Sequence, residues 1–211
     1  MKALSALLLG VLLTANAHAE PTWVGGGVAV QAVGRDAMVG DAAEILSGLG
    51  VPADESDLRF VPRAHVAFDL YDAPRLATGL GVDLEASWFA RSVEGKNALL
   101  SYRVRRDLVP LAAMFRIGVG RKERGRFQFG VGPVLAWSRF SESGWLGDGT
   151  RNQLGYGFGV SLGGRFPLGE AVRALLGFGA QLIKVPHAGT LVADGGTAWT
   201  AGAFVGLEFG L

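Results

Sequence analysis

The sequence predicts a transmembrane β-barrel of eight antiparallel strands, and three observations lead to that fold class. Apolar residues recur at every second position over stretches of roughly ten residues, the period and length of a strand that crosses a bilayer. Hydrophobic residues make up 49% of the chain, yet beyond its N-terminal segment no uninterrupted apolar run approaches the roughly 20 residues that a spanning helix needs. The 33 glycines would destabilise helices but suit the crowded interior of a small barrel.

Residues 1–19 predict a cleavable signal peptide. Lys2 precedes an uncharged apolar stretch at 3–15, and 17–19 supply a small-x-small cleavage site. This stretch is shorter than a membrane anchor requires. We therefore expect a mature barrel over 20–211.

Charge and cysteine content exclude several classes of protein. With 20 basic and 19 acidic residues, the net charge of +1 gives no electrostatic basis for binding nucleic acid. The absence of cysteine excludes disulfides and thiolate metal sites. We expect no metal and no cofactor, and a monomer in the bacterial outer membrane.

The first four strands are predicted at 23–33, 63–71, 76–88 and 102–117. In the first, valines occupy one face; in the second, Tyr71 falls on the inward face; the third alternates most regularly. The fourth is irregular, because Tyr102 and Val104 have the opposite parity to the apolar residues below them. This break predicts either a bulge near 106–108 or an upper part that projects beyond the membrane.

The other four strands are predicted at 127–137, 154–165, 172–184 and 197–211. Short connections at 72–75, 120–126 and 167–171 have turn composition. We place these short turns in the periplasm and the longer connections outside the cell. An even strand number with alternating short and long connections is what an up-and-down barrel requires.

The first long loop, 35–59, predicts a short helix over the barrel mouth. Its apolar residues recur at helical spacing, with aspartates to cap the helix and glycines to end it: Asp36, Met38, Asp41, Ala42, Ile45, Leu46, Gly48, Leu49 and Gly50. The loop is also acidic, but its spacing is unlike that of a calcium-binding loop. We interpret the acidic residues as a solvated surface, with cation binding as the alternative.

Aromatic residues are predicted to form two girdles at the membrane interfaces. The upper girdle comprises Trp88, Trp137, Tyr156 and Trp199, and the lower comprises Phe115, Phe127, Phe166 and Phe209. Because the strand directions come from the connections alone, the girdles support the topology independently.

Inward parity predicts a set of lumen charges with balanced signs: Arg63, Asp69, Asp83, Glu85, Arg116, Arg165, Arg173 and Glu208. Isolated charges would be costly in so narrow an interior. We therefore expect a hydrogen-bonded network of ion pairs that plugs the lumen. A catalytic pair formed by Asp83 and Glu85 is the alternative interpretation.

A second basic set lies near the upper strand ends: Arg91, Lys96, Arg103, Arg105, Arg106, Arg139 and Arg151. At that level these residues are placed to contact the phosphates of lipopolysaccharide. The lower turns are basic too, through Arg121, Lys122, Arg124 and Arg126. Ordinary snorkelling of interfacial side chains is therefore the alternative.

The sequence resembles the outer-membrane protein β-barrel domain family, the small eight-stranded barrels that include OmpX-like and opacity-like proteins. The resemblance covers essentially the whole mature chain. It rests on the signal, on the glycine-rich strand FQFGVGPVLAW and on the terminal pattern Val205, Leu207, Phe209 and Leu211. It implies that the barrel-assembly machinery and periplasmic chaperones act on the chain, with this terminal pattern as the assembly signal.

We expect a non-enzymatic barrel with a structural or surface-interaction role through its extracellular loops. A lipid A-directed enzyme or acyl-chain binder, and a narrow pore, are the alternatives. A hydrolase triad would need a histidine beside a serine and a carboxylate. His65 points inward without a serine at the spacing of lipid A deacylases, and His187 falls in a loop.

Overall fold

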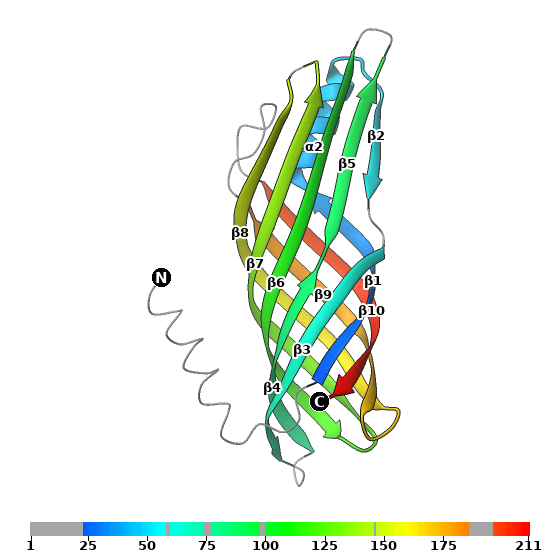
Figure 1. The fold of residues 1–211 in the computed structure, drawn as a ribbon, viewed down its shortest axis with the longest axis vertical. Coiled ribbons are helices and arrows are strands. Elements are labelled where there is room, and N and C mark those ends of the chain that lie inside the picture. Colours follow the sequence, from blue (N-terminus) through cyan, green and yellow to red (C-terminus); the bar gives the residue numbers. More distant parts are fainter. Residues whose placement is uncertain (1–22, 58–59, 74–76, 98–99, 146, 186–195) are drawn as a thin grey trace, which may run out of the picture.

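The computed structural model describes residues 23–57, 60–73, 77–97, 100–145, 147–185 and 196–211 (Figure 1). Its elements are β1 (Trp23–Asp36), α2 (Ala37–Gly48), β2 (Ala53–Asp57), β3 (Phe60–Ala73), β4 (Thr78–Ser87), β5 (Phe89–Lys96), β6 (Ser101–Arg121), β7 (Gly125–Gly144), β8 (Gly149–Pro167), β9 (Val172–Lys184) and β10 (Thr197–Gly210). The predicted signal peptide lies outside the described residues.

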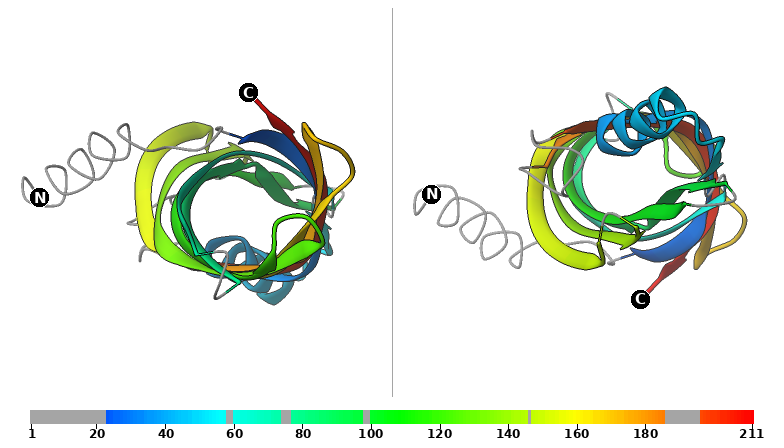
Figure 2. Two further views of the ribbon diagram at one scale, coloured as in Figure 1. Left: turned by 90° about the horizontal axis from the view of Figure 1, so that it is seen from below. Right: turned by 90° about the horizontal axis from the view of Figure 1, so that it is seen from above.

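The strands close into an antiparallel ring (Figure 2). The order around the wall is β1, β3, β4, β6, β7, β8, β9 and β10, and β10 pairs again with β1. Strand β5 prolongs β4, since both pair with β6 in one continuous register. Strand β2 pairs only with β5 in the described part. The prediction of an eight-stranded barrel with a short helix in the first long loop is confirmed.

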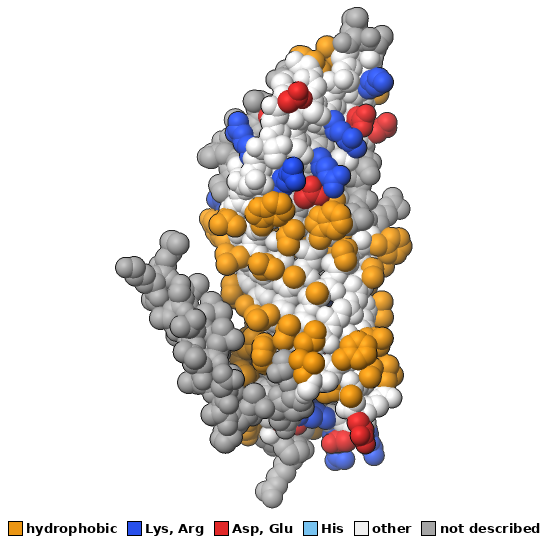
Figure 3. Space-filling model, viewed as in Figure 1, with side chains coloured by type: hydrophobic (Ala, Val, Ile, Leu, Met, Phe, Trp, Pro, Cys, Tyr) orange, Lys and Arg blue, Asp and Glu red, His pale blue; other side chains and the backbone are white. Residues whose placement is uncertain are grey.

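A broad apolar band surrounds the barrel and is exposed on its outer face (Figure 3). On β8, for example, Leu154, Tyr156 and Phe158 are exposed, whereas Gly155 between them faces inward and is buried. Charged side chains gather above and below the band (Figure 3). Outward apolar residues that alternate with small or polar inward ones are the signature of a lipid-facing barrel wall. Separately, no helix within the described ranges is long and apolar enough to cross a membrane.

The wall is taller on one side than on the other. Strands β6, β7 and β8 contain 21, 20 and 19 residues, whereas β9 contains 13. Along β6 the inward and outward positions alternate without a break, and Tyr102 and Val104 lie on the buried inward face with Arg106. The expected bulge at 106–108 is therefore absent from β6, and the alternative prediction of a projecting upper part is correct.

The register shifts lie elsewhere, between Gln31 and Val33 on β1 and between Asp69 and Tyr71 on β3. The second shift changes the parity of the lower end of β3. Tyr71 is consequently 61% exposed on the outer face, opposite Leu80. The prediction that Tyr71 faces inward is wrong, because an extra residue in a strand rotates everything beyond it to the other face.

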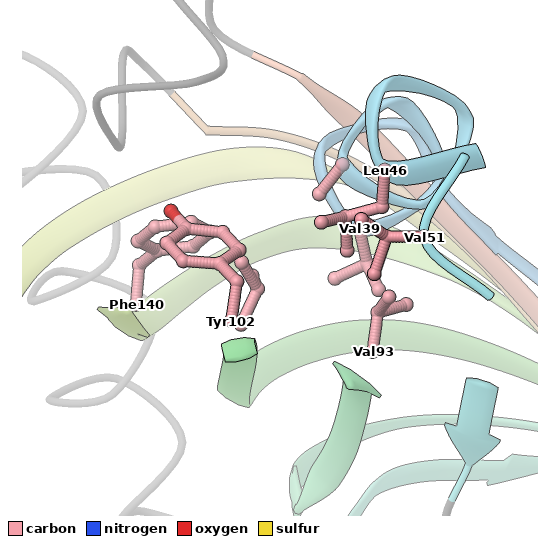
Figure 4. Packing of buried hydrophobic residues seen from close by; sticks show 8 residues of the cluster. Val39, Leu46, Val51, Val93, Tyr102 and Phe140 are labelled. Atoms are coloured by element: carbon pink, nitrogen blue, oxygen red, sulfur yellow. The ribbon is translucent and has the colours of Figure 1, made fainter. Parts of the chain in front are cut away.

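Helix α2 lies over the upper end of the ring and packs on the projecting wall (Figures 2 and 4). Val39, Ala42 and Leu46 are fully buried on one helix face. They belong to one hydrophobic cluster with Val51, Val93, Tyr102, Val104 and Phe140. Burial of each large apolar side chain contributes roughly 1.5–3 kcal/mol, so this cluster holds the helix on the wall.

The helix ends in the left-handed turn that its glycine predicts. Gly50 has a φ of 70°, and the Val51 amide donates a 3.0 Å hydrogen bond to the Leu46 carbonyl. Such a C-terminal motif satisfies carbonyls that the helix leaves open. The predicted buried face is partly wrong, because Leu49 is 54% exposed and Val51, beyond the turn, is buried instead.

A second hydrophobic cluster fills the lumen below α2. It consists of Leu108, Ala112, Met114, Val134, Ala136, Ile183, Val185 and Ala198. These side chains come from β6, β7, β9 and β10 and from the segments that flank β9 and β10. The lumen therefore holds an apolar layer above the ion pairs around Glu208, and buried polar side chains such as Arg106 and Glu142 lie above that layer.

Candidate functional site

Arg165 lies at the centre of the charged half of the lumen, with its side chain only 3% exposed. Its Nε donates a 2.7 Å hydrogen bond to Glu208 on β10, and its Nη2 donates a 2.9 Å hydrogen bond to Asp83 on β4. Nη1 donates to Gln128 on β7. Since β6 and β7 separate β4 from β8 in the wall, this one guanidinium spans the interior.

Arg116 forms the neighbouring group of ion pairs. Its Nη2 donates a 2.6 Å hydrogen bond to Asp69, and its Nε donates a 3.1 Å hydrogen bond to Asp83. Asp83 therefore bridges Arg116 and Arg165. Charge-assisted hydrogen bonds of this kind are strong, and they compensate for the loss of water around each buried charge.

Glu208 has no exposed surface and accepts hydrogen bonds from three residues. Besides Arg165, His65 Nε2 lies 2.7 Å from Oε1, and Arg173 Nε lies 3.0 Å from Oε2. The Arg173 guanidinium also stacks on the ring of Trp23 at 3.5 Å, a cation–π contact. Every oxygen of this carboxylate is thus satisfied.

Arg63 and Glu85 form a separate pair higher in the lumen, at 2.5 Å. The Arg63 guanidinium lies 4.0 Å from the ring centroid of Phe204. The structure thus brings all the predicted lumen charges into ion pairs, in one group around Asp83 and Glu208 and one pair above it.

One further pair lies below the group and was missed from the sequence. Arg126 Nη2 donates a 2.6 Å hydrogen bond to Asp72, and Lys122 Nζ lies 3.4 Å from the same carboxylate. The sequence placed all three residues in turns, yet Arg126 shares inward parity with Gln128. Burial lowers the pKa of Lys122, and the nearby Arg126 and Arg173 lower it further.

The residues considered for catalysis are held in these pairs. Asp83 is bound by two arginines and Glu85 by one. His65 is directed at Glu208, and His187 lies outside the described residues. Within the described ranges, no three His, Cys, Asp or Glu side chains are grouped so as to hold a metal ion.

Two cavities flank the ion pairs. The upper cavity has a volume of about 50 Å³ and is lined by Arg63, Glu85, Met114 and Gln181 among others. The lower cavity, of about 300 Å³, lies at the lower mouth of the barrel between the two described turns and is lined by Lys122, Arg126 and Arg173 among others. The upper volume is sufficient for a few water molecules.

The predicted girdle residues lie on the outer face of the wall. Trp88, Trp137, Tyr156 and Trp199 are 38–61% exposed, and Phe115, Phe127 and Phe209 are 45–68% exposed. Phe166 is half-buried and packs edge-on against Phe127, with ring centroids 6.0 Å apart.

The predicted upper basic set divides between the two faces of the wall. Lys96, Arg103, Arg105 and Arg139 lie on the outer face and are exposed. Arg106 is 1% exposed inside the barrel, where its Nε donates a 3.1 Å hydrogen bond to Ser138. Arg91 and Arg151 are the cross-strand partners of Arg106 and of the buried Phe140, so they share this inner face. Arg106 therefore cannot make the expected contact with lipopolysaccharide, because the interior parity continues unbroken into the projecting wall and buries its side chain.

No protein-family model matches the sequence, and no curated protein matches it either. Among solved structures, OprG from Pseudomonas aeruginosa is similar over 92% of this chain and 97% of its own, with 13% identity and a TM-score of 0.50. Neisserial surface protein A is similar over 92% and 99%, with 10% identity and a TM-score of 0.42. The outer membrane protease OmpT from Escherichia coli is similar over 75% and 66%, with 8% identity and a TM-score of 0.49.

At these identities the likeness concerns the fold, and the function is not carried over with it. The fold is the closed antiparallel ring, and the exposed apolar band supplies the surface that such a ring presents to lipid. The chain therefore has the fold of the small bacterial outer-membrane β-barrels.

Proposed function

We propose that this barrel is a closed, non-enzymatic outer-membrane protein that acts at the cell surface through its projecting wall. The observation that carries the proposal is the filled lumen. Arg165 joins β8 to both β4 and β10 across the interior, and its side chain is 3% exposed. Above it follow the apolar cluster around Met114 and then the packed helix α2. An ion moving through the barrel would have to break each of these layers.

The surface role is supported by what projects above the apolar band. The upper parts of β5 to β8, together with β2 and α2, form a wall with its own hydrophobic cluster around Leu46 and Tyr102. A packed cluster outside the membrane holds a defined shape, whereas a loop without one would not. Rigid surfaces of this kind are suited to binding a partner.

The ion pairs also support a non-enzymatic role over a lipid-directed enzyme. Each candidate carboxylate is paired with arginine, and the carboxylate beside His65 is shared with two arginines. A general base needs a group that is free to accept a proton from the substrate. Structural pairing explains these residues without a reaction.

Two measurements separate the proposal from its competitors. Planar-bilayer recording of the purified mature barrel, with a porin as positive control, is expected to show no sized conductance steps. Lipid A from outer membranes with and without the protein is expected to have the same mass. Sized steps would establish a narrow pore, and a fixed mass increment would establish a lipid-modifying enzyme.

For biogenesis, we propose that β10 presents the assembly signal. Val205, Leu207 and Phe209 are exposed on its outer face, and Leu211 follows at its end. The barrel-assembly machinery and periplasmic chaperones are the expected partners at this stage. Phe209→Ser should lower the fraction of protein recovered in the outer membrane, whereas Phe158→Ser, on β8, should not.

A further inference from the structure

Arg139 lies at the upper edge of the apolar band. This residue lies on the outer face of β7, two positions above the girdle residue Trp137. Its cross-strand partners are Asp107 on β6 and Asn152 on β8. Figure 3 shows Lys and Arg side chains gathered directly above the band on this face of the molecule.

The carboxylate opposite Arg139 is already occupied. Arg105 donates two hydrogen bonds to Asp107, from Nε at 3.1 Å and from Nη2 at 2.9 Å. The indole Nε1 of Trp88 donates a third, at 3.3 Å. Arg139 itself forms no ion pair with any residue of the described ranges. An exposed guanidinium therefore stands beside a neutralised pair, at the boundary between the apolar band and water.

A second exposed cation lies on β9, beyond β8 from Arg139. Lys184 is exposed two positions above the outward Leu182, and its cross-strand partner on β8 is the girdle residue Tyr156. Among the described residues Lys184 also has no acidic partner. The sequence gives no sign of this role, because Lys184 is the last residue of its alternating strand and has no basic neighbours.

The opposite side of the barrel lacks this arrangement. At the upper ends of β3 and β10 the exposed outward residues are aromatic, namely Phe60 and Trp199. No Lys or Arg side chain described on the outer face of β1, β3 or β10 lies at that edge. Among the described residues, Arg139 on β7 and Lys184 on β9 are the exposed cations at this edge that have no ion pair.

A ligand for this face needs anionic groups at the interface and an apolar body that lies along the wall. Guanidinium binds phosphate in bidentate fashion, and ammonium binds it as a point charge. Around the cations, the exposed Leu135, Leu154 and Phe158 offer a surface for acyl chains. We propose that the β7–β9 face binds a phosphorylated glycolipid of the outer leaflet, with one phosphate at Arg139 and a second anionic group at Lys184.

The test is native mass spectrometry of the mature barrel in detergent, titrated with diphosphorylated lipid A. The double variant Arg139→Gln/Lys184→Gln is compared with the matched control Arg121→Gln/Arg124→Gln, which removes two positive charges from the turn at the opposite end of the barrel. All four positions are exposed, and heat-modifiable electrophoretic mobility verifies that both variants fold. The first variant should weaken lipid A binding about tenfold, and the control should change it less than twofold.

Three outcomes would overturn the proposal. An equal loss in both variants would show that net charge alone attracts the lipid. If the first variant bound lipid A as tightly as the wild type, Arg139 and Lys184 would not be part of the binding site. Phosphatidylglycerol bound by the wild type as tightly as lipid A would show that the face does not select a glycolipid. Dephosphorylated lipid A should bind the wild type and the first variant alike, and a difference there would exclude phosphate as the recognised group.

Discussion

His65 Nε2 lies 2.7 Å from Glu208 Oε1, although 143 positions separate the two residues in the chain. They stand on β3 and β10, which flank β1 on either side. Gly25 of β1 is the cross-strand partner of both. The contact therefore passes directly over a glycine, and it exists because that position has no side chain.

Gly25→Ala should destabilise the barrel by about 1–3 kcal/mol. A Cβ atom at this position would lie 2.5 Å from His65 Cε1 and 2.6 Å from the backbone oxygen of Leu207, so the ring would have to leave Glu208. Urea unfolding of the barrel in phospholipid vesicles measures the effect. Gly26→Ala is the control, since its Cβ would point outward with its nearest neighbour at 3.5 Å. Equal costs for the two substitutions would contradict the interpretation of this glycine.

Glu208→Gln should cost about 3–5 kcal/mol in the same unfolding assay. The amide leaves the buried Arg165 and the largely buried Arg173 without their shared negative charge. The control is Glu94→Gln, because Glu94 and its partner Arg103 are more than half exposed and lie 3.6 Å apart. Loss of such a surface pair should cost less than about 1 kcal/mol. A cost at position 208 no larger than that at position 94 would argue against a structural plug.

Leu46→Ala should loosen α2 while leaving the barrel intact. Leu46 is fully buried against the projecting wall, and truncation of such a residue typically costs about 2–5 kcal/mol. Limited proteolysis within 37–51 should accelerate at least tenfold, whereas Leu49→Ala, at a 54% exposed position, should leave the rate unchanged. Bilayer conductance should stay at zero in both variants because the ion pairs below remain. Ion flow through the Leu46 variant would instead identify α2 as the principal barrier.

Val160→Arg should destabilise the barrel in vesicles by about 2–4 kcal/mol. Val160 is 40% exposed on the outer face of β8, midway between the two girdles. Asn152→Arg is the control on the same strand, because that position lies above the apolar band. If arginine were tolerated equally at both positions, lipid would not be contacting β8 at the height of Val160.

Most of the wall and the ion pairs could be predicted from the sequence because a strand alternates with a fixed period of two. That period places Asp83 and Arg165 inside whatever their neighbours are, and the pairing follows from charge. The same rule gave the wrong face for Tyr71, because the register shift between β3 and β4 has no local signal in the sequence. In the projecting wall the alternation predicted the wrong faces, because there the outer face contacts water and the inner face is apolar. In this part of β6 the apolar Tyr102 faces inward and the charged Arg105 faces outward, the reverse of the pattern lower on the strand. The sequence of a single strand does not show at which residue this reversal begins.

The ring closes between β1 and β10, with Trp23 opposite Gly210. Among the described strands these are the first and the last in sequence order, so the backbone groups along one edge of β1 have no native partner until β10 joins the sheet. A nascent chain in that state carries a glycine-rich, apolar edge able to pair with other chains, and its closure depends on contacts of the longest sequence separation, which form slowly. The same pairing that leaves the finished cylinder without an open edge in the bilayer thus leaves its unclosed precursor vulnerable to aggregation until β10 has paired with β1.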